Sequence, residues 1–122
     1  MIRLIHAQQE ELDAVLVFRK LASLLNDDPI KALFCKVAEE ERGHAVILQK
    51  ITGKELEANN SKVCIVGFLF RFWGMTSVLK LLAKGEFKSA ACYRIYAVQY
   101  PELTQIAGEE LQHSRQLKAL MP

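Results

Sequence analysis

Apolar side chains recur along this chain at alternating steps of three and four residues, the spacing that places them on one face of an α-helix. The pattern predicts four long helices, with one shorter and densely apolar helix in the connection between the second and the third. The approximate ranges are 4–26, 29–52, 63–73, 77–99 and 102–121. No segment has the period of two that a half-buried β-strand requires. We therefore expect an all-α fold, a four-helix bundle with a long crossover between its second and third helices.

Residues that start and stop helices lie at the predicted boundaries. Asp28 is a suitable N-cap, and Pro29 suits the first turn of the second helix. Gly53 suits the position just after that helix, where a left-handed backbone conformation is common. Thr76 is the N-cap candidate of the third long helix. These boundaries leave residues 54–62 as a polar connection that leads into the crossover.

Each of the four long helices has polar residues where its periodic face should be apolar. The first and third helices each place one Glu there, and the second and fourth each place a Glu-x-x-His unit, whose two side chains share one helix face. The residues concerned are Glu11, Glu41, His44, Glu86, Glu110 and His113. The alternative is an ordinary solvated helix face, and for the first helix a shift in phase would turn Glu10 inward instead of Glu11.

The two halves of the chain repeat this arrangement. Each half has a helix with one inward Glu, followed by a helix with an inward Glu-x-x-His. Seven residues after the single Glu comes an aromatic residue, which is Phe18 in the first half and Tyr93 in the second. Two such hairpins make a pseudo-twofold bundle. Tyr93 is then either a core side chain or a group that hydrogen-bonds a metal-ligating carboxylate.

Four carboxylates at one level of a bundle core would repel one another and resist desolvation. No Lys or Arg occupies the inner faces at that level, so two divalent cations are the expected compensation. One Glu from each of two helices and Glu-x-x-His from each of the other two form the ligand set of di-iron and di-manganese carboxylate bundles. We expect Glu41 and Glu110 to bridge two metal ions and Glu11 and Glu86 to be terminal ligands. Oxygen ligands with two imidazoles suit iron or manganese, and zinc would also bind.

Chain length, net charge and cysteine count limit the classes of function that fit this chain. The 122 residues fit a single domain, 1–122, and the net charge of +2 is too small and too evenly spread to argue for nucleic acid or an anionic membrane. The three cysteines are few and far apart, which indicates a reducing, cytoplasmic setting and small buried side chains rather than disulfides. The N-terminus becomes polar too early for a signal peptide.

The apolar stretch 63–83 has about the length of a transmembrane helix. Arg71 and Lys80 lie inside it and Gly74 divides it, so we favour a short crossover helix followed by the start of the third long helix. Its aromatic run would cover one end of the bundle or a subunit interface. Membrane contact would be peripheral at most.

The six ligand candidates and the seven-residue steps to Phe18 and Tyr93 resemble the ferritin-like superfamily, in particular its rubrerythrin branch. Residues 51–55 and 84–86 are most similar to the ferritin-like domain associated with vacuolar-type membrane iron transporters. The resemblance covers nearly the whole chain. It implies a di-iron site, ferroxidase or peroxidase-type redox activity with Fe(II) and O2 or peroxide, a role in iron handling or oxidative-stress defence, and a homodimer.

Two departures from the rubrerythrins bear on the activity. The chain has no residues for their four-cysteine rubredoxin domain, and Ser89 stands where they carry a further carboxylate three residues after the third-helix ligand. Both favour ferroxidase activity or plain iron binding over a peroxidase, which would need a separate electron donor. The alternative function is a non-catalytic iron-binding or iron-sensing module that delivers iron to a partner such as a membrane transporter.

Overall fold

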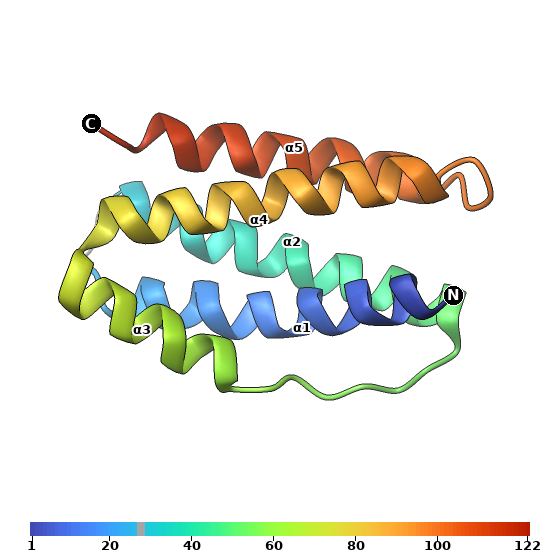
Figure 1. Ribbon diagram of the computed structural model, residues 1–122, viewed down its shortest axis with the longest axis horizontal. Coiled ribbons are helices and arrows are strands. Elements are labelled where there is room, and N and C mark those ends of the chain that lie inside the picture. Colours follow the sequence, from blue (N-terminus) through green and yellow to red (C-terminus); the bar gives the residue numbers. More distant parts are fainter. Residues whose placement is uncertain (27–28) are drawn as a thin grey trace. The chain divides into compact units, whose positions relative to one another are not determined.

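The computed structural model describes residues 1–26 and 29–122, so the proposed N-cap Asp28 lies outside the described residues. The described part contains five helices and no strand (Figure 1). The helices are α1 (Ile2–Ser23), α2 (Pro29–Thr52), α3 (Ser61–Trp73), α4 (Met75–Tyr96) and α5 (Leu103–Ala119). This confirms the all-α prediction and the short extra helix between the second and third long helices. The chain forms two compact units, Met1–Phe68 and Leu69–Pro122, which we call unit 1 and unit 2.

Unit 1 is built on the hairpin of α1 and α2, which lie side by side (Figure 1). The periodic apolar residues predicted for the two helices form its core, and the rings of Phe18 and Phe34 meet at 5.7 Å between centroids with a tilt of 58°. Burial of a Leu or Phe side chain stabilises a fold by about 1.5–3 kcal/mol. The apolar residues on either side of the polar positions therefore hold the hairpin together.

Unit 2 repeats the design with α4 packed on α5. Leu79, Tyr93, Ile106 and Leu117 are buried in its core. The hydroxyl of Ser114 donates a hydrogen bond to the backbone carbonyl of Ala83 at 2.8 Å, which fixes the position of α5 along α4. Each unit is thus a hairpin of two packed helices that carry polar side chains in its interior.

Two glycines shape the ends of the helices. Gly53 has a φ of +70° and follows α2 as predicted. Gly74 has a φ of +86° and separates α3 from α4, which begins at Met75. Thr76 therefore lies inside α4, and its predicted role as the N-cap is wrong. This positive φ, open to glycine at little cost, lets the chain turn within a single residue between the two helices.

Residues 53–60, which we call the crossover strap, run along α1 and are held by its polar side chains. The amide of Gln8 donates to the Lys54 carbonyl at 2.8 Å, and that of Gln9 donates to the Glu57 carbonyl at 2.7 Å. The carboxylate of Asp13 accepts the Asn59 N–H at 2.7 Å. Gln8 and Asp13 are buried, so their two bonds are partly shielded from water, whereas the Gln9 bond is exposed. They fix the path of the chain between α2 and α3.

The helix α3 leaves most of its apolar surface exposed. Val66 is the only buried side chain of this fully described helix, and Phe68, Phe72 and Trp73 are each more than half exposed. No described helix has both the length and the apolar character that a membrane crossing needs. The predicted burial of the cysteines is wrong for two of them, because the side chains of Cys35 and Cys64 are exposed. Cys35 directly follows the buried Phe34, and one residue along a helix turns the side chain by about 100° onto the outer face.

Replacing Asp13 by Ala should lower the free energy of unfolding by about 1.5–3 kcal/mol, because a hydrogen bond to a buried carboxylate is lost and the strap is released. Urea denaturation followed by circular dichroism measures this change. Glu10→Ala is the matched control on the same helix, since Glu10 is 42% exposed and meets Lys62 only at 3.8 Å. That surface pair should contribute less than about 1 kcal/mol. Equal losses in the two variants would contradict a structural role for the strap contact.

Candidate metal centre

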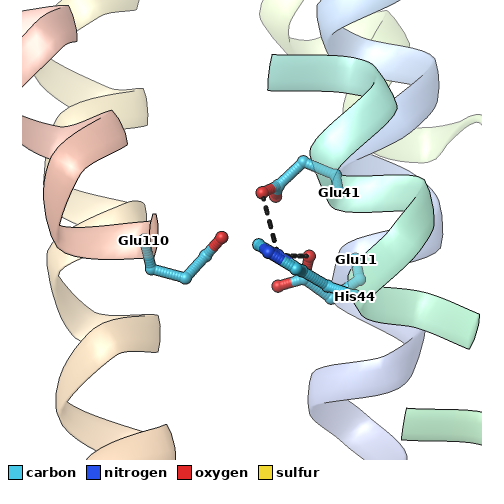
Figure 2. A group of neighbouring side chains, drawn as sticks. All are labelled: Glu11, Glu41, His44 and Glu110. Carbon is cyan, nitrogen blue, oxygen red and sulfur yellow. Dashed lines mark hydrogen bonds and ion pairs between the residues drawn. The ribbon is translucent and has the colours of Figure 1, made fainter. Parts of the chain in front are cut away.

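In unit 1, three predicted ligands come together, and we call Glu11, Glu41 and His44 the first triad. Figure 2 shows Glu11 reaching from α1 toward the Glu41 and His44 side chains of α2. The His44 Nδ1 lies 3.2 Å from Glu11 Oε2 and 3.5 Å from Glu41 Oε1. All three side chains are at most 3% exposed. The Glu-x-x-His spacing accounts for two of these positions, and the packing of α1 on α2 supplies the third.

In unit 2, the second triad consists of Glu86 from α4 with Glu110 and His113 from α5. The His113 Nδ1 lies 3.7 Å from Glu86 Oε1 and 3.5 Å from Glu110 Oε1. All three residues are buried. The two triads have the same composition and the same connectivity. The repeat read from the sequence therefore extends to side-chain geometry.

The acidic residues next to the triad residues in the sequence are more exposed than the triads. The Glu10 side chain is 42% exposed, whereas Glu11 is buried, so the expected helix phase is confirmed. Glu39 is exposed and pairs with Arg42 and Arg19, each at 3.2 Å. Hydrogen bonds from Arg42 and then Arg19 lower the pKa of Glu39 below its usual value. Of the Glu39-Glu40-Glu41 run, only Glu41 is fully buried.

Electrostatics makes each triad an unusual element of a helical core. When both carboxyls are ionised, each triad carries an excess negative charge even with a protonated imidazole. Buried charge without compensation is strongly unfavourable, and partial pairing leaves part of that cost in place. A bound divalent cation would reverse the balance and convert the imidazole into a neutral ligand. The donor set therefore fits a cation better than it fits a closed structural core.

The spacing of the donor atoms also fits a metal ion. Within each triad, one ligand atom from every residue lies within 4.8 Å of the others. Oxygen and nitrogen donors bind ions such as Zn²⁺ or Mg²⁺ at about 2.0–2.2 Å, so two donors of one ion are at most about 4.4 Å apart. Small side-chain movements would bring the donor atoms from the observed separations to those that one ion requires. Two carboxylates and one imidazole suit iron, manganese or zinc.

Other residues near the triads were predicted only in part. Tyr93 is buried, as is its counterpart Phe18 in unit 1, while the role of Tyr93 beside a ligand stays a prediction. His6 is a surface residue, 74% exposed, and contacts Glu10 at 2.9 Å. The supporting roles of Gln8 and Ser114 were missed. Gln8 lies one turn before Glu11 in an otherwise apolar stripe, and that polar interruption was the signal in the sequence.

Comparisons of the chain with protein-family models, with curated proteins and with solved structures found no match. The evidence on function is therefore the geometry of the two triads. It consists of two buried, equivalent groups of two carboxylates and one imidazole that could each hold a metal ion.

Proposed function

We propose that this chain is a di-metal carboxylate protein of the ferritin-like type, in which the first and second triads join to bind two iron ions. The two hairpins would close into a four-helix bundle with a six-ligand centre made of Glu11, Glu41, His44, Glu86, Glu110 and His113. Its proposed activity is the oxidation of Fe(II) by O2 or peroxide, in iron handling or defence against oxidants.

The observation that carries this proposal is the duplication of a buried triad with excess negative charge. A single buried Glu-His contact occurs in many cores as a structural pair. Two equivalent triads, each with a surplus carboxylate, imply a common positive partner. Two divalent cations would neutralise four carboxylates, and four-helix bundles with this ligand set bind two such ions. A pair of iron ions would supply the electrons for reduction of the oxidant.

The protein's own groups would act by binding and by excluding water. Glu41 and Glu110 would be the carboxylates shared by the two ions, and Glu11 and Glu86 would each hold one of them. The buried apolar side chains of each unit keep bulk water away, which strengthens ligand–ion electrostatics. Long helical side chains lean toward the N-terminus of their helix, so Tyr93 leans toward the turns that lead to Glu86. From there its hydroxyl would donate a hydrogen bond to a ligating carboxylate and hold its orientation.

Anaerobic loading with Fe(II), followed by desalting and elemental analysis, should yield about two iron ions per chain. The double variant His44→Ala with His113→Ala should retain almost none, because each triad loses its nitrogen donor. His6→Ala is the control, since that histidine is exposed and outside both triads. Failure of the wild-type protein to bind iron would disprove the proposal.

The single variants of the same histidines test whether the triads act together. In a shared centre, His44→Ala or His113→Ala alone should weaken the binding of both ions, because the bridging carboxylates serve both. Removal of a group that only orients a ligand already costs about 10–100-fold in affinity or activity, so loss of a ligand itself should cost at least as much. Retention of one tightly bound ion in each single variant would mean two independent sites, and the shared centre would be wrong.

Mixing the protein with Fe(II) in air should speed Fe(III) formation well above the rate in buffer, followed by absorbance and oxygen consumption. Glu41→Gln should slow this reaction by about 100-fold, because it removes a ligand charge. Glu39→Gln, which changes an exposed neighbour on the same helix, should leave the rate unchanged. Iron binding without any acceleration would favour the alternative, a non-catalytic module that stores or delivers iron.

A further inference from the structure

The crossover helix α3 carries an exposed apolar stripe. Ile65, Phe68 and Phe72 follow one another at steps of three and four residues, which places them on one helix face. They are 62%, 58% and 59% exposed, and the adjacent Trp73 is 64% exposed. Scattered exposed apolar residues are ordinary, whereas a continuous aromatic stripe along a helix marks an interaction surface.

The charge around this stripe has a single sign. No Asp or Glu occurs between Glu57 and Glu86, although the chain has 14 acidic residues in total. The same segment contains four cations, all exposed: Lys62, Arg71, Lys80 and Lys84. Arg71 also lies over the Phe72 ring at 5.8 Å, so its stem and charge border the stripe. The near-neutral charge of the whole chain conceals this local asymmetry.

The stripe is a poor fit for a second copy of α3. A 13-residue helix is about 20 Å long and about 10 Å wide, so one face offers about 200 Å². A stable protein interface needs about 800 Å² on each partner. Pairing two α3 helices would also bring like charges together, because the helix carries Lys62 and Arg71 and no acidic residue. The surface instead calls for a partner that is both apolar and negatively charged.

We propose that α3 docks in the plane of an anionic lipid bilayer. Short helices with aromatic residues on one face and Lys or Arg beside it lie at the boundary of headgroups and acyl chains. Ile65, Phe68 and Phe72 enter the acyl boundary, and Trp73 sits at headgroup level, where its ring is favoured. Lys62 and Arg71 contact the anionic headgroups. The proposal does not depend on the metal centre.

Trp73 is the only tryptophan of the chain, so its fluorescence reports on this surface directly. Vesicles of phosphatidylcholine with phosphatidylserine should shift its emission to the blue, and brominated acyl chains should quench it. Vesicles of phosphatidylcholine alone should have little effect, and high salt should reverse the binding because it screens the cations. These measurements use the unaltered protein, so they do not depend on the folding of a variant.

Variants then assign the effect to the stripe. Phe68→Ser with Phe72→Ser should reduce co-sedimentation with anionic vesicles about tenfold or more. The double variant lacks the two aromatic side chains that enter the bilayer. Val98→Ser, at a residue that is 92% exposed outside α3, is the matched control and should bind like the wild type. Circular dichroism should be unchanged in all variants.

Two results would overturn the proposal. The first is Trp73 emission that neither shifts nor is quenched with anionic vesicles. The second is a blue shift that develops with protein concentration in the absence of lipid, accompanied by a doubled mass in solution. That result would assign the stripe to a second copy of the chain.

Discussion

A carboxylate that leaves water must find compensating charge or hydrogen bonds, and this constraint governs both hairpins. Each hairpin surrounds one imidazole with two buried carboxylates, at distances of 3.2–3.7 Å from Nδ1. The apolar core around them supplies the stability that makes such a polar group tolerable. Sites of this kind are costly to the fold in which they lie, and that cost is a reason to associate them with function.

Different side chains of α1 contribute to the first triad and hold the crossover strap. On α1, Gln8 and Glu11 share one face, since they are three residues apart. Asp13, two residues after Glu11, points about 200° away around the helix and holds Asn59 of the crossover strap. The strap is thus held from two sides of α1, by Gln8 on the face that carries Glu11 and by Asp13 on the opposite side.

Much of this architecture could be predicted from the sequence because it follows from periodicity. The bounds of α2 match the prediction, since Gly53 ends the helix as expected. The inward direction of Glu11 rather than Glu10 followed from the apolar residues three and four positions away. Duplication of Glu-x-x-His was equally visible, because local spacing alone brings those two side chains together.

What the sequence did not reveal depends on contacts between distant residues. The hydrogen bonds of Gln8 and Asp13 to the strap require knowledge of where residues 54–59 run. Composition did not decide whether the apolar surface of α3 covers one end of the bundle or a subunit interface, and Gly74 rather than Thr76 precedes α4. The exposed positions of Cys35 and Cys64 likewise depend on helix phase, which residue type does not determine.

X-ray absorption at the iron edge of the iron-loaded protein tests the shared two-metal centre most directly. Joined triads predict a shell of oxygen and nitrogen ligands at about 2.0–2.2 Å and a second iron at about 3.5–4 Å. They also predict no sulfur ligand, since no cysteine belongs to either triad. Isolated iron without an iron neighbour, or iron bound to sulfur, would contradict the assignment of the two triads to one centre.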